Sequence, residues 1–210
     1  MIRILIADDH AVVHRGLKQI VDEEHDMAMV GHAHNGQELL TLVRKQPCDV
    51  VVLDISMPGR SGLDLLKDVK QERPTLPVLM LSMHSEDQYA VRALKVGAAG
   101  YLTKESAPEE LVKAIRKVVT GGRYVSQSLA EQLAVDIGAD TERPLHETLS
   151  DREHQVLCLI ASGKSVTDIG AELSLSVKTI STYRARILEK MNMKNNAELT
   201  HYAIQNRLVG

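Results

Sequence analysis

The sequence is poor in aromatic side chains and in cysteine. Neither Phe nor Trp occurs among its 210 residues, and aromatic residues make up 2% of the chain. Hydrophobic cores must therefore be built from Leu, Ile, Val, Ala and Met, and stacking of nucleobases on aromatic platforms is disfavoured. The two cysteines, Cys48 and Cys158, are far apart and lie in apolar segments, which favours reduced, buried thiols over a disulfide.

The sequence also lacks a long hydrophobic run. None of its apolar stretches approaches the roughly 20 residues that span a bilayer, and Asp8 follows the start too soon for a signal peptide. We therefore expect a cytoplasmic protein. The net charge of −3 is uneven, because residues 126–148 carry one basic and five acidic side chains whereas 149–210 carry eight and six. A weakly basic segment behind an acidic connector is compatible with nucleic-acid binding without requiring it.

Up to about residue 122, short apolar runs alternate with segments of amphipathic helical spacing. We expect strands at 2–7, 27–31, 49–53, 77–82 and 100–102. Helices are expected between and after them, at 11–24, 36–45, 62–72, 86–96 and 108–120. Five such units predict an α/β domain over 1–122 with a doubly wound, five-stranded parallel sheet.

The rest of the chain reads differently. Residues 123–146 are interpreted as a linker, with a further helix over 126–137 and a Gly- and Pro-containing stretch over 138–148. A small all-α domain is expected over 147–210, with helices at 151–162, 166–173, 177–191 and 196–206. The second and third of these helices, joined by Ser174-Leu175-Ser176, form a helix-turn-helix pattern.

Charged and hydroxyl side chains follow four of the five expected strands. Asp8 and Asp9 follow the first strand, Asp54 the third, Ser82 the fourth and Lys104 the fifth. Ligands of a doubly wound sheet bind beyond the carboxyl ends of its strands. Three carboxylates gathered there repel one another unless a cation neutralises them, and hard oxygen ligands favour Mg²⁺.

This arrangement predicts phosphoryl chemistry on Asp54. Asp54 would be the nucleophile that forms an acyl phosphate, while Lys104 and Ser82 would surround the phosphoryl oxygens. The metal is expected to be held by Asp8, Asp9, Asp54 and the backbone carbonyl of Ser56. Singly, an Asp at a strand end is more often a helix cap and a Lys there is usually solvated, but the matching residue types together favour the functional interpretation.

Four motifs support this interpretation: Ile4-Leu5-Ile6-Ala7-Asp8-Asp9-His10, Val52-Leu53-Asp54-Ile55-Ser56-Met57-Pro58-Gly59, Leu81-Ser82 and Gly97-Ala98-Ala99-Gly100-Tyr101-Leu102-Thr103-Lys104. Together they resemble the receiver domain of bacterial response regulators. The resemblance implies a flavodoxin-like fold, a sensor histidine kinase as phosphoryl donor to Asp54, and Ser82 and Tyr101 as a switch pair. Met83 stands where many receivers have a small residue, and we expect it to restrict access to the phosphoryl group.

The helix expected over 177–191 has two unlike faces. Its inward face would consist of Ile180, Ile187, Leu188 and Met191. Its outward face would carry Lys178, Ser181, Thr182, Ala185 and Arg186, a set that fits a major groove. We expect phosphate contacts mainly from Lys178, Thr179, Arg184 and Lys190, and base-edge contacts from Ser181, Thr182 and Ala185. The ordinary alternative is a solvated helix face.

The motifs of this segment include Leu149-Ser150-Asp151-Arg152-Glu153, Ile169-Gly170-Ala171-Glu172-Leu173 and Ser176-Val177-Lys178-Thr179-Ile180. They resemble the LuxR-type DNA-binding domain over about 147–208. A receiver followed by this domain looks like the NarL/FixJ family of transcription regulators, and residues 181–186 resemble its GacA/UvrY or BvgA-like branch. In two departures from the family, Gly170 replaces the usual Ala and Asn196 replaces a common Arg.

The resemblance implies binding to double-stranded promoter DNA as a homodimer paired through the last helix. The candidate dimer contacts are Leu199, Thr200 and Ala203, and packing inside one monomer is an equal alternative for each.

Other functions remain to be weighed. The chain could be a receiver that acts without phosphorylation, although the complete acidic set argues against this. An aspartate-dependent phosphatase usually places its nucleophile after the first strand with another Asp two residues on, whereas Asp8 and Asp9 are adjacent. A flavin phosphate needs hydroxyls and glycines where this chain has acidic residues, and the His10/His14 and His32/His34 pairs lack further zinc ligands. We therefore expect a phosphoacceptor regulator and not an enzyme.

Overall fold

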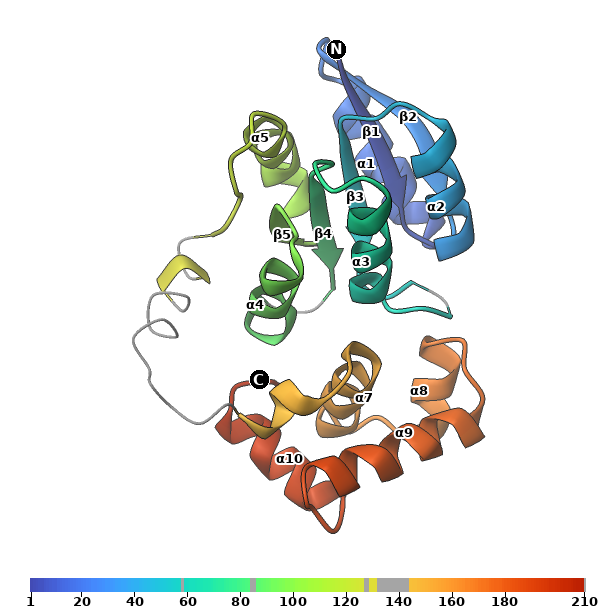
Figure 1. Cartoon of the computed structure of the whole chain (residues 1–210), viewed down its shortest axis with the longest axis vertical. Helices are drawn as coiled ribbons and strands as arrows, with labels where there is room; N and C mark the ends of the chain where they lie inside the picture. The colour runs from blue at the N-terminus through green and yellow to red at the C-terminus, as the bar shows by residue number, and fades with distance from the viewer. Residues whose placement is uncertain (58, 84–85, 127–128, 132–143, 210) are drawn as a thin grey trace. The chain divides into compact units, whose positions relative to one another are not determined.

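The computed structural model describes residues 1–57, 59–83, 86–126, 129–131 and 144–209. Its contacts divide the chain into two compact units, Met1–Gln132 and Leu133–Gly210. The first unit alternates strands with helices and the second is helical (Figure 1). Of the helix expected over 126–137, residues 129–131 are helical and most of the rest lies outside the described residues. No helix in the described ranges combines the length and the apolar character needed to cross a lipid bilayer.

The N-terminal unit is a five-stranded parallel sheet in the order β2-β1-β3-β4-β5. Its strands are β1 (Ile2–Ala7), β2 (Met27–Ala33), β3 (Val50–Asp54), β4 (Val78–Ser82) and β5 (Gly100–Thr103). The helices that follow them are α1 (Ala11–Asp22), α2 (Gly36–Lys45), α3 (Gly62–Glu72), α4 (Glu86–Val96) and α5 (Ala107–Val119). The predicted doubly wound sheet is therefore confirmed.

The sheet is covered by helices on both faces. Leu17 and Val21 of α1 and Leu111 and Ile115 of α5 belong to the same hydrophobic cluster as Val52 of β3. On the other side α2 packs against α3, and α3 against α4. Every residue of β3 and β4 is buried, which explains why these strands read as continuous apolar runs without alternation.

In the C-terminal unit, the first element that the structure describes is a 3-10 helix, η1 (Leu145–Thr148), which lies in a stretch expected to be irregular linker. Pro144 precedes it and accepts a hydrogen bond from the Glu147 N–H at 2.9 Å. The hydroxyl of Thr148 donates to the Leu145 carbonyl at 2.7 Å. These local bonds give the end of the connector a defined conformation.

Four α-helices follow: α7 (Asp151–Ala161), α8 (Val166–Glu172), α9 (Val177–Lys190) and α10 (Asn196–Gln205). Each begins at a side-chain cap that accepts a backbone N–H of the first turn, from Ser150, Ser165, Ser176 and Asn195 respectively. The first two caps are completed by Glu153 and Asp168 as capping boxes. Such caps satisfy N–H groups that have no partner within the helix.

The turn between α8 and α9 is tight. Ser174 adopts a left-handed conformation with φ of 53°, and the Leu175 N–H donates to the Gly170 carbonyl at 2.8 Å. A Cβ added to Gly170 would lie 2.9 Å from the Leu175 carbonyl oxygen. Gly170, the glycine of α8 that departs from the family pattern, therefore lies where the backbone of the turn approaches this helix closely.

Candidate functional site

The polar residues expected at the strand ends lie at one edge of the sheet. Asp8 follows β1, Asp54 is the last residue of β3, and Lys104 follows β5. The strand register pairs Ala7 with Leu53, Asp54 with Leu81, and Ser82 with Thr103. Because the strands are parallel, their carboxyl ends meet and gather these side chains.

Lys104 joins the two buried carboxylates of this edge. Its Nζ lies 2.7 Å from Asp8 Oδ2 and 3.0 Å from Asp54 Oδ2. The side chains of Asp8 and Asp54 are 0% and 1% exposed, and that of Lys104 is 6% exposed. One ammonium cannot neutralise two carboxylates, so the centre retains negative charge in a poorly solvated place.

The pKa values of these groups reflect their burial and their mutual charges. Burial raises the pKa of Asp54 above its usual range, and the charge of Asp8 adds to this, while Lys104 opposes it. Burial alone would lower the pKa of Lys104, but the charges of Asp54 and Asp8 outweigh it and the pKa is raised. Lys104 is therefore held as the cation of the site.

The centre has the donor set of a divalent cation site. One oxygen each of Asp8, Asp9 and Asp54 and one ring nitrogen of His10 all lie within 4.8 Å of one another. The Asp9 side chain is 34% exposed and opens the centre to solvent. Carboxylate oxygens with room for water are ligands that suit Mg²⁺, so these residues fit the expected metal. The Ser56 N–H donates to Asp54 Oδ1 at 3.2 Å, which places this residue beside the centre.

The expected switch residues are both buried. Ser82 and Tyr101 are each 0% exposed, and the Ser82 carbonyl accepts a hydrogen bond from the Lys104 N–H at 2.7 Å. Met83, the next residue, has 75% of its surface exposed. The residue expected to restrict access to Asp54 therefore has a solvent-facing side chain.

Two contributors to the site were not foreseen from the sequence. Gly62 starts α3 directly against the acceptor, and a Cβ there would lie 2.3 Å from the Asp54 carbonyl oxygen and 2.6 Å from Ile55 Cα. His10, to which the sequence assigns no role in the acidic centre, faces Asp8 and Asp9. The sequence signal for Gly62 is a glycine at the first helical position after the loop that carries Asp54. The sequence signal for His10 is its position directly after Asp9.

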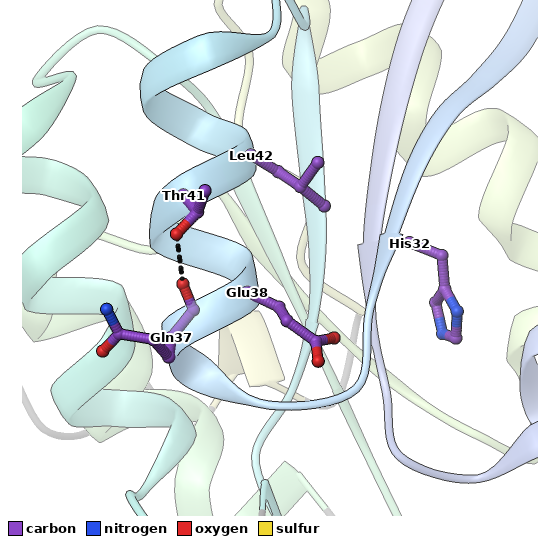
Figure 2. A pocket seen from close by; sticks show the side chains of 5 residues that line it. All are labelled: His32, Gln37, Glu38, Thr41 and Leu42. Carbon is purple, nitrogen blue, oxygen red and sulfur yellow. Dashed lines mark hydrogen bonds between the residues drawn. The ribbon is translucent and has the colours of Figure 1, made fainter.

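An open depression of about 300 Å³ lies beside β2 and is lined by His32, Gln37, Glu38, Thr41 and Leu42 (Figure 2). Glu38 accepts hydrogen bonds from the His34 N–H and the Asn35 amide, each at 2.8 Å. The Thr41 hydroxyl donates to the Gln37 carbonyl at 2.8 Å. These polar groups of the depression thus form hydrogen bonds with residues at the start of α2 and do not point toward a common ligand position.

The two faces of α9 are arranged as expected. Ile180, Ile187 and Met191 are buried and Leu188 is partly buried. The outward residues Lys178, Ser181, Thr182, Ala185 and Arg186 are all exposed. Thr179 and Arg184 are partly buried at the sides of the helix. The helix therefore presents a continuous polar and basic face.

Two basic residues expected to contact phosphates have partners within their own unit. Lys190 Nζ lies 2.6 Å from Glu153 Oε2, and Arg184 Nε donates to Asn196 Oδ1 at 2.6 Å. Burial alone would raise the pKa of Glu153, but the hydrogen bond from Lys190 and those from Ser150 lower it. The ammonium of Lys190 holds the end of α9 to the start of α7, and its contact with a DNA phosphate stays a prediction.

Two of the three candidate dimer residues lie in the core of the unit. Leu199 and Ala203 are 0% exposed, and α10 packs against α7. Their side chains therefore fill the core of one monomer, which was the alternative interpretation. Thr200 is partly exposed and remains a candidate contact.

Two protein-family models match the chain. The model of the response regulator receiver domain matches residues 4–116, and that of the luxR family of bacterial regulatory proteins matches residues 147–203. The response regulator UvrY of Escherichia coli K12 is 37% identical over 210 residues, which cover 99% of this chain and 96% of UvrY. The response regulator GacA of Pseudomonas aeruginosa is 36% identical over 210 residues, covering 100% and 98%.

Solved structures extend the similarity. RcsB of Salmonella enterica serovar Typhimurium, bound to promoter rprA with the phosphomimetic BeF3⁻, is 28% identical with a TM-score of 0.66, covering 96% of this chain and 97% of that one. A LuxR-family two-component response regulator from Aurantimonas is 32% identical with a TM-score of 0.60, covering 65% and 98%. The sequence relatives and RcsB both span the two units described above.

Proposed function

This chain belongs to the NarL/FixJ family of two-component response regulators, and from that premise we propose that phosphorylation of Asp54 switches DNA binding by α9 and thereby regulates transcription. The observation that supports the proposal most directly is the pairing of two buried carboxylates, Asp8 and Asp54, with Lys104 at the open edge of the sheet. A carboxylate can act as the nucleophile that forms an aspartyl phosphate, and a fixed ammonium beside it stabilises the charge of the phosphoryl oxygens.

The proposed donor is a phosphohistidine of a sensor histidine kinase. An oxygen of the Asp54 carboxylate attacks the phosphorus, and the P–N bond breaks as the new O–P bond forms. The kinase imidazole leaves after taking up a proton from solvent, and Asp54 becomes an acyl phosphate. The protein is thus a phosphoacceptor that handles its own acyl phosphate rather than an enzyme acting on a separate substrate.

Each neighbour of Asp54 has a proposed role. Mg²⁺, held by Asp8, Asp9, Asp54 and the backbone carbonyl of Ser56, supplies positive charge to the phosphoryl oxygens when bound. Lys104 donates to another phosphoryl oxygen and Ser82 to a third. Movement of Ser82 toward the phosphoryl group is coupled to the position of Tyr101. Through this pair, phosphorylation changes the conformation of the surface formed by β5 and α4.

The output of the switch is proposed to be double-stranded promoter DNA. The exposed face of α9 would enter the major groove, with Ser181, Thr182 and Ala185 nearest the base edges. Lys178, Thr179, Arg184 and Lys190 would contact phosphates, and Arg186 belongs to the same exposed face. The protein would bind as a homodimer, with Thr200 of α10 at the contact, and would act in the cytoplasm, where promoter DNA is found.

The acceptor can be tested by mass. The full chain is incubated with Mg²⁺ and acetyl phosphate, and the intact mass of the wild type is compared with those of Asp54→Ala and Asp22→Ala. We expect a labile gain of about 80 Da, one phosphoryl group on a carboxylate, in the wild type and in Asp22→Ala but not in Asp54→Ala. Asp22 is a matched control because it is an exposed aspartate of α1 paired with Lys18.

Failure of the wild type to gain mass under conditions that label another receiver would overturn the proposed phosphorylation. A gain of the same size in Asp54→Ala would show that a different residue is the acceptor.

A further inference from the structure

His10 occupies an unusual place at the start of α1. It is the N-cap residue of this helix, yet among the described residues its side chain makes no capping hydrogen bond. Its backbone N–H donates instead to Asp8 Oδ1 at 2.7 Å. The ring turns toward the acidic centre, with Nδ1 2.9 Å from Asp9 Oδ1 and 3.2 Å from Asp8 Oδ1.

This ring nitrogen belongs to the same group of donor atoms as the three carboxylates. It lies within 4.8 Å of oxygens of Asp8, Asp9 and Asp54, which themselves form the proposed metal site. The His10 side chain is 58% exposed, so it can adjust its position around an ion without disturbing the core. The buried carboxylates beside it retain negative charge that Lys104 leaves uncompensated.

An imidazole changes which metal a carboxylate site prefers. Mg²⁺ is a hard cation that favours oxygen ligands and keeps several waters. Imidazole is a softer ligand than carboxylate, and divalent transition metals accept it more readily than Mg²⁺ does, with an affinity that rises from Mn²⁺ to Co²⁺. Replacing one water of the site by a ring nitrogen therefore favours these ions over Mg²⁺.

We propose that His10 is a ligand of the receiver metal site and sets its preference toward divalent transition metals such as Mn²⁺ and Co²⁺. The inference rests on the proposed function, because it concerns the metal that accompanies Asp54. It assigns to His10 a role in metal choice, whereas the competing role is a hydrogen bond from the imidazole to the Asp8 and Asp9 carboxylates. The two roles differ in whether a nitrogen enters the coordination sphere.

The experiment uses the full chain with Mn²⁺ as the probe. Free Mn²⁺ is counted by electron paramagnetic resonance to obtain its Kd, and Mg²⁺ is then titrated as a competitor. Bound Mn²⁺ is examined by pulsed resonance for coupling to a directly attached ¹⁴N nucleus. The variants are His10→Ala and, as a matched control, His25→Ala, an exposed histidine in the connection between α1 and β2.

We expect ¹⁴N coupling in the wild type and in His25→Ala, and its loss in His10→Ala. The preference for Mn²⁺ over Mg²⁺, as a ratio of Kd values, should fall at least about tenfold in His10→Ala, because changing only the hydrogen-bond partner of a metal ligand already costs about 10- to 100-fold in affinity. Mg²⁺ binding by itself should change less than Mn²⁺ binding.

Failure of this inference can be told apart from failure of the proposed function. If Mn²⁺ binds in a way that Asp54→Ala weakens, but without ¹⁴N coupling and with the same preference in His10→Ala, the role of His10 is overturned while the metal site stands. If neither ion binds in a manner that depends on Asp54, both the metal site and the role of His10 are overturned.

Discussion

Gly62 controls the backbone around Asp54 more directly than any side chain of the pocket. The two atoms nearest to an added Cβ belong to the backbone of Asp54 and Ile55, so no side-chain rotation can relieve the contact. The Gly62 N–H also donates to the Ile55 carbonyl at 2.8 Å. The loop that carries the acceptor can close onto α3 only when this position has no side chain.

Gly62→Ala should therefore destabilise the N-terminal unit and impair phosphorylation together. We expect a loss of about 2 kcal/mol in the free energy of unfolding, as for other overpacked sites, measured by urea denaturation, with slower labelling by acetyl phosphate. Gly16→Ala on α1 is the control, because a Cβ there meets nothing within 4 Å. That change should stabilise by up to about 1 kcal/mol, and an equal loss in both variants would contradict the explanation.

The ion pair between Arg3 and Asp49 ties the first residues of β1 to the residue before β3. Arg3 Nη2 lies 2.8 Å from Asp49 Oδ1, and the Arg3 backbone N–H donates to Asp49 Oδ2 at 2.7 Å. Hydrogen bonds from Arg3 lower the pKa of Asp49 from 3.8 to about 2. Because the folded-state pKa is depressed, the stabilisation is present above pH 4 and is lost as the pH falls through about 2.

Asp49→Asn should lower the free energy of unfolding at neutral pH by about 1 kcal/mol, a value reduced for the partial exposure of the pair. The difference from the wild type should shrink as the pH is lowered from 4 toward 2, measured by urea denaturation at several pH values. Asp22→Asn, which breaks the exposed pair with Lys18, should have a smaller effect. A difference for Asp49→Asn that stayed constant with pH would contradict the electrostatic origin.

At the scale of elements, the α8–α9 turn is held in a conformation that its sequence does not favour. Ser174 has φ of 53°, a left-handed conformation that costs an ordinary L-residue about 1 kcal/mol. Glycine adopts it without a Cβ penalty. The turn nevertheless forms because α8 packs against α9, which buries Ile169 of α8, Leu173 at the end of that helix and Ile180 of α9.

Ser174→Gly should accordingly raise the free energy of unfolding of the C-terminal unit by about 0.5 kcal/mol. Glycine removes the backbone strain of the folded state, but part of this gain is lost because glycine also makes the unfolded chain more flexible. Thermal unfolding followed by circular dichroism would detect this as a higher Tm. Ser181→Gly, in the exposed middle of α9, should instead lower stability by roughly 0.5 kcal/mol. A decrease in both variants would show that the turn is not strained at Ser174.

At the scale of the whole molecule, the expected property is coupling between two separate units. The connector is acidic, with one basic and five acidic residues over 126–148, while residues 149–210 carry a small excess of basic side chains. We therefore hypothesise that the unphosphorylated receiver opposes DNA binding or dimer formation and that phosphorylation removes this opposition. Such coupling is a differential free energy between two states of the chain.

Phosphorylation of the full chain should strengthen DNA binding at least about tenfold, which corresponds to roughly 1.4 kcal/mol. The measurement is fluorescence anisotropy with a duplex selected from a random library, at a fixed salt concentration because phosphate contacts make affinity salt-dependent. Asp54→Ala should show no response to acetyl phosphate. Equal affinities of the phosphorylated and unphosphorylated wild type would refute the coupling.

The sequence by itself determined the order of the elements and the position of the acidic centre. Strands β3 and β4 are buried on both faces, so their apolar runs were readable without knowledge of their neighbours. Once a parallel sheet was predicted, Asp8, Asp54 and Lys104 had to meet, because the carboxyl ends of its strands share one edge. The predicted boundaries differ from the structure at some strand ends, and β2 continues to Ala33 rather than ending at Gly31.

The tertiary structure alone decided which partners these elements use. Lys190 pairs with Glu153, which is 37 positions away in the sequence. Helical periodicity gives no information about contacts between residues so far apart in the chain. Periodicity showed that α10 has an apolar face, but only packing revealed that Leu199 and Ala203 are buried within the unit, where α10 packs against α7. The close approach of α3 to Asp54 and the turn of His10 toward the carboxylates are likewise set by how segments pack, because contacts between distant residues depend on the whole fold.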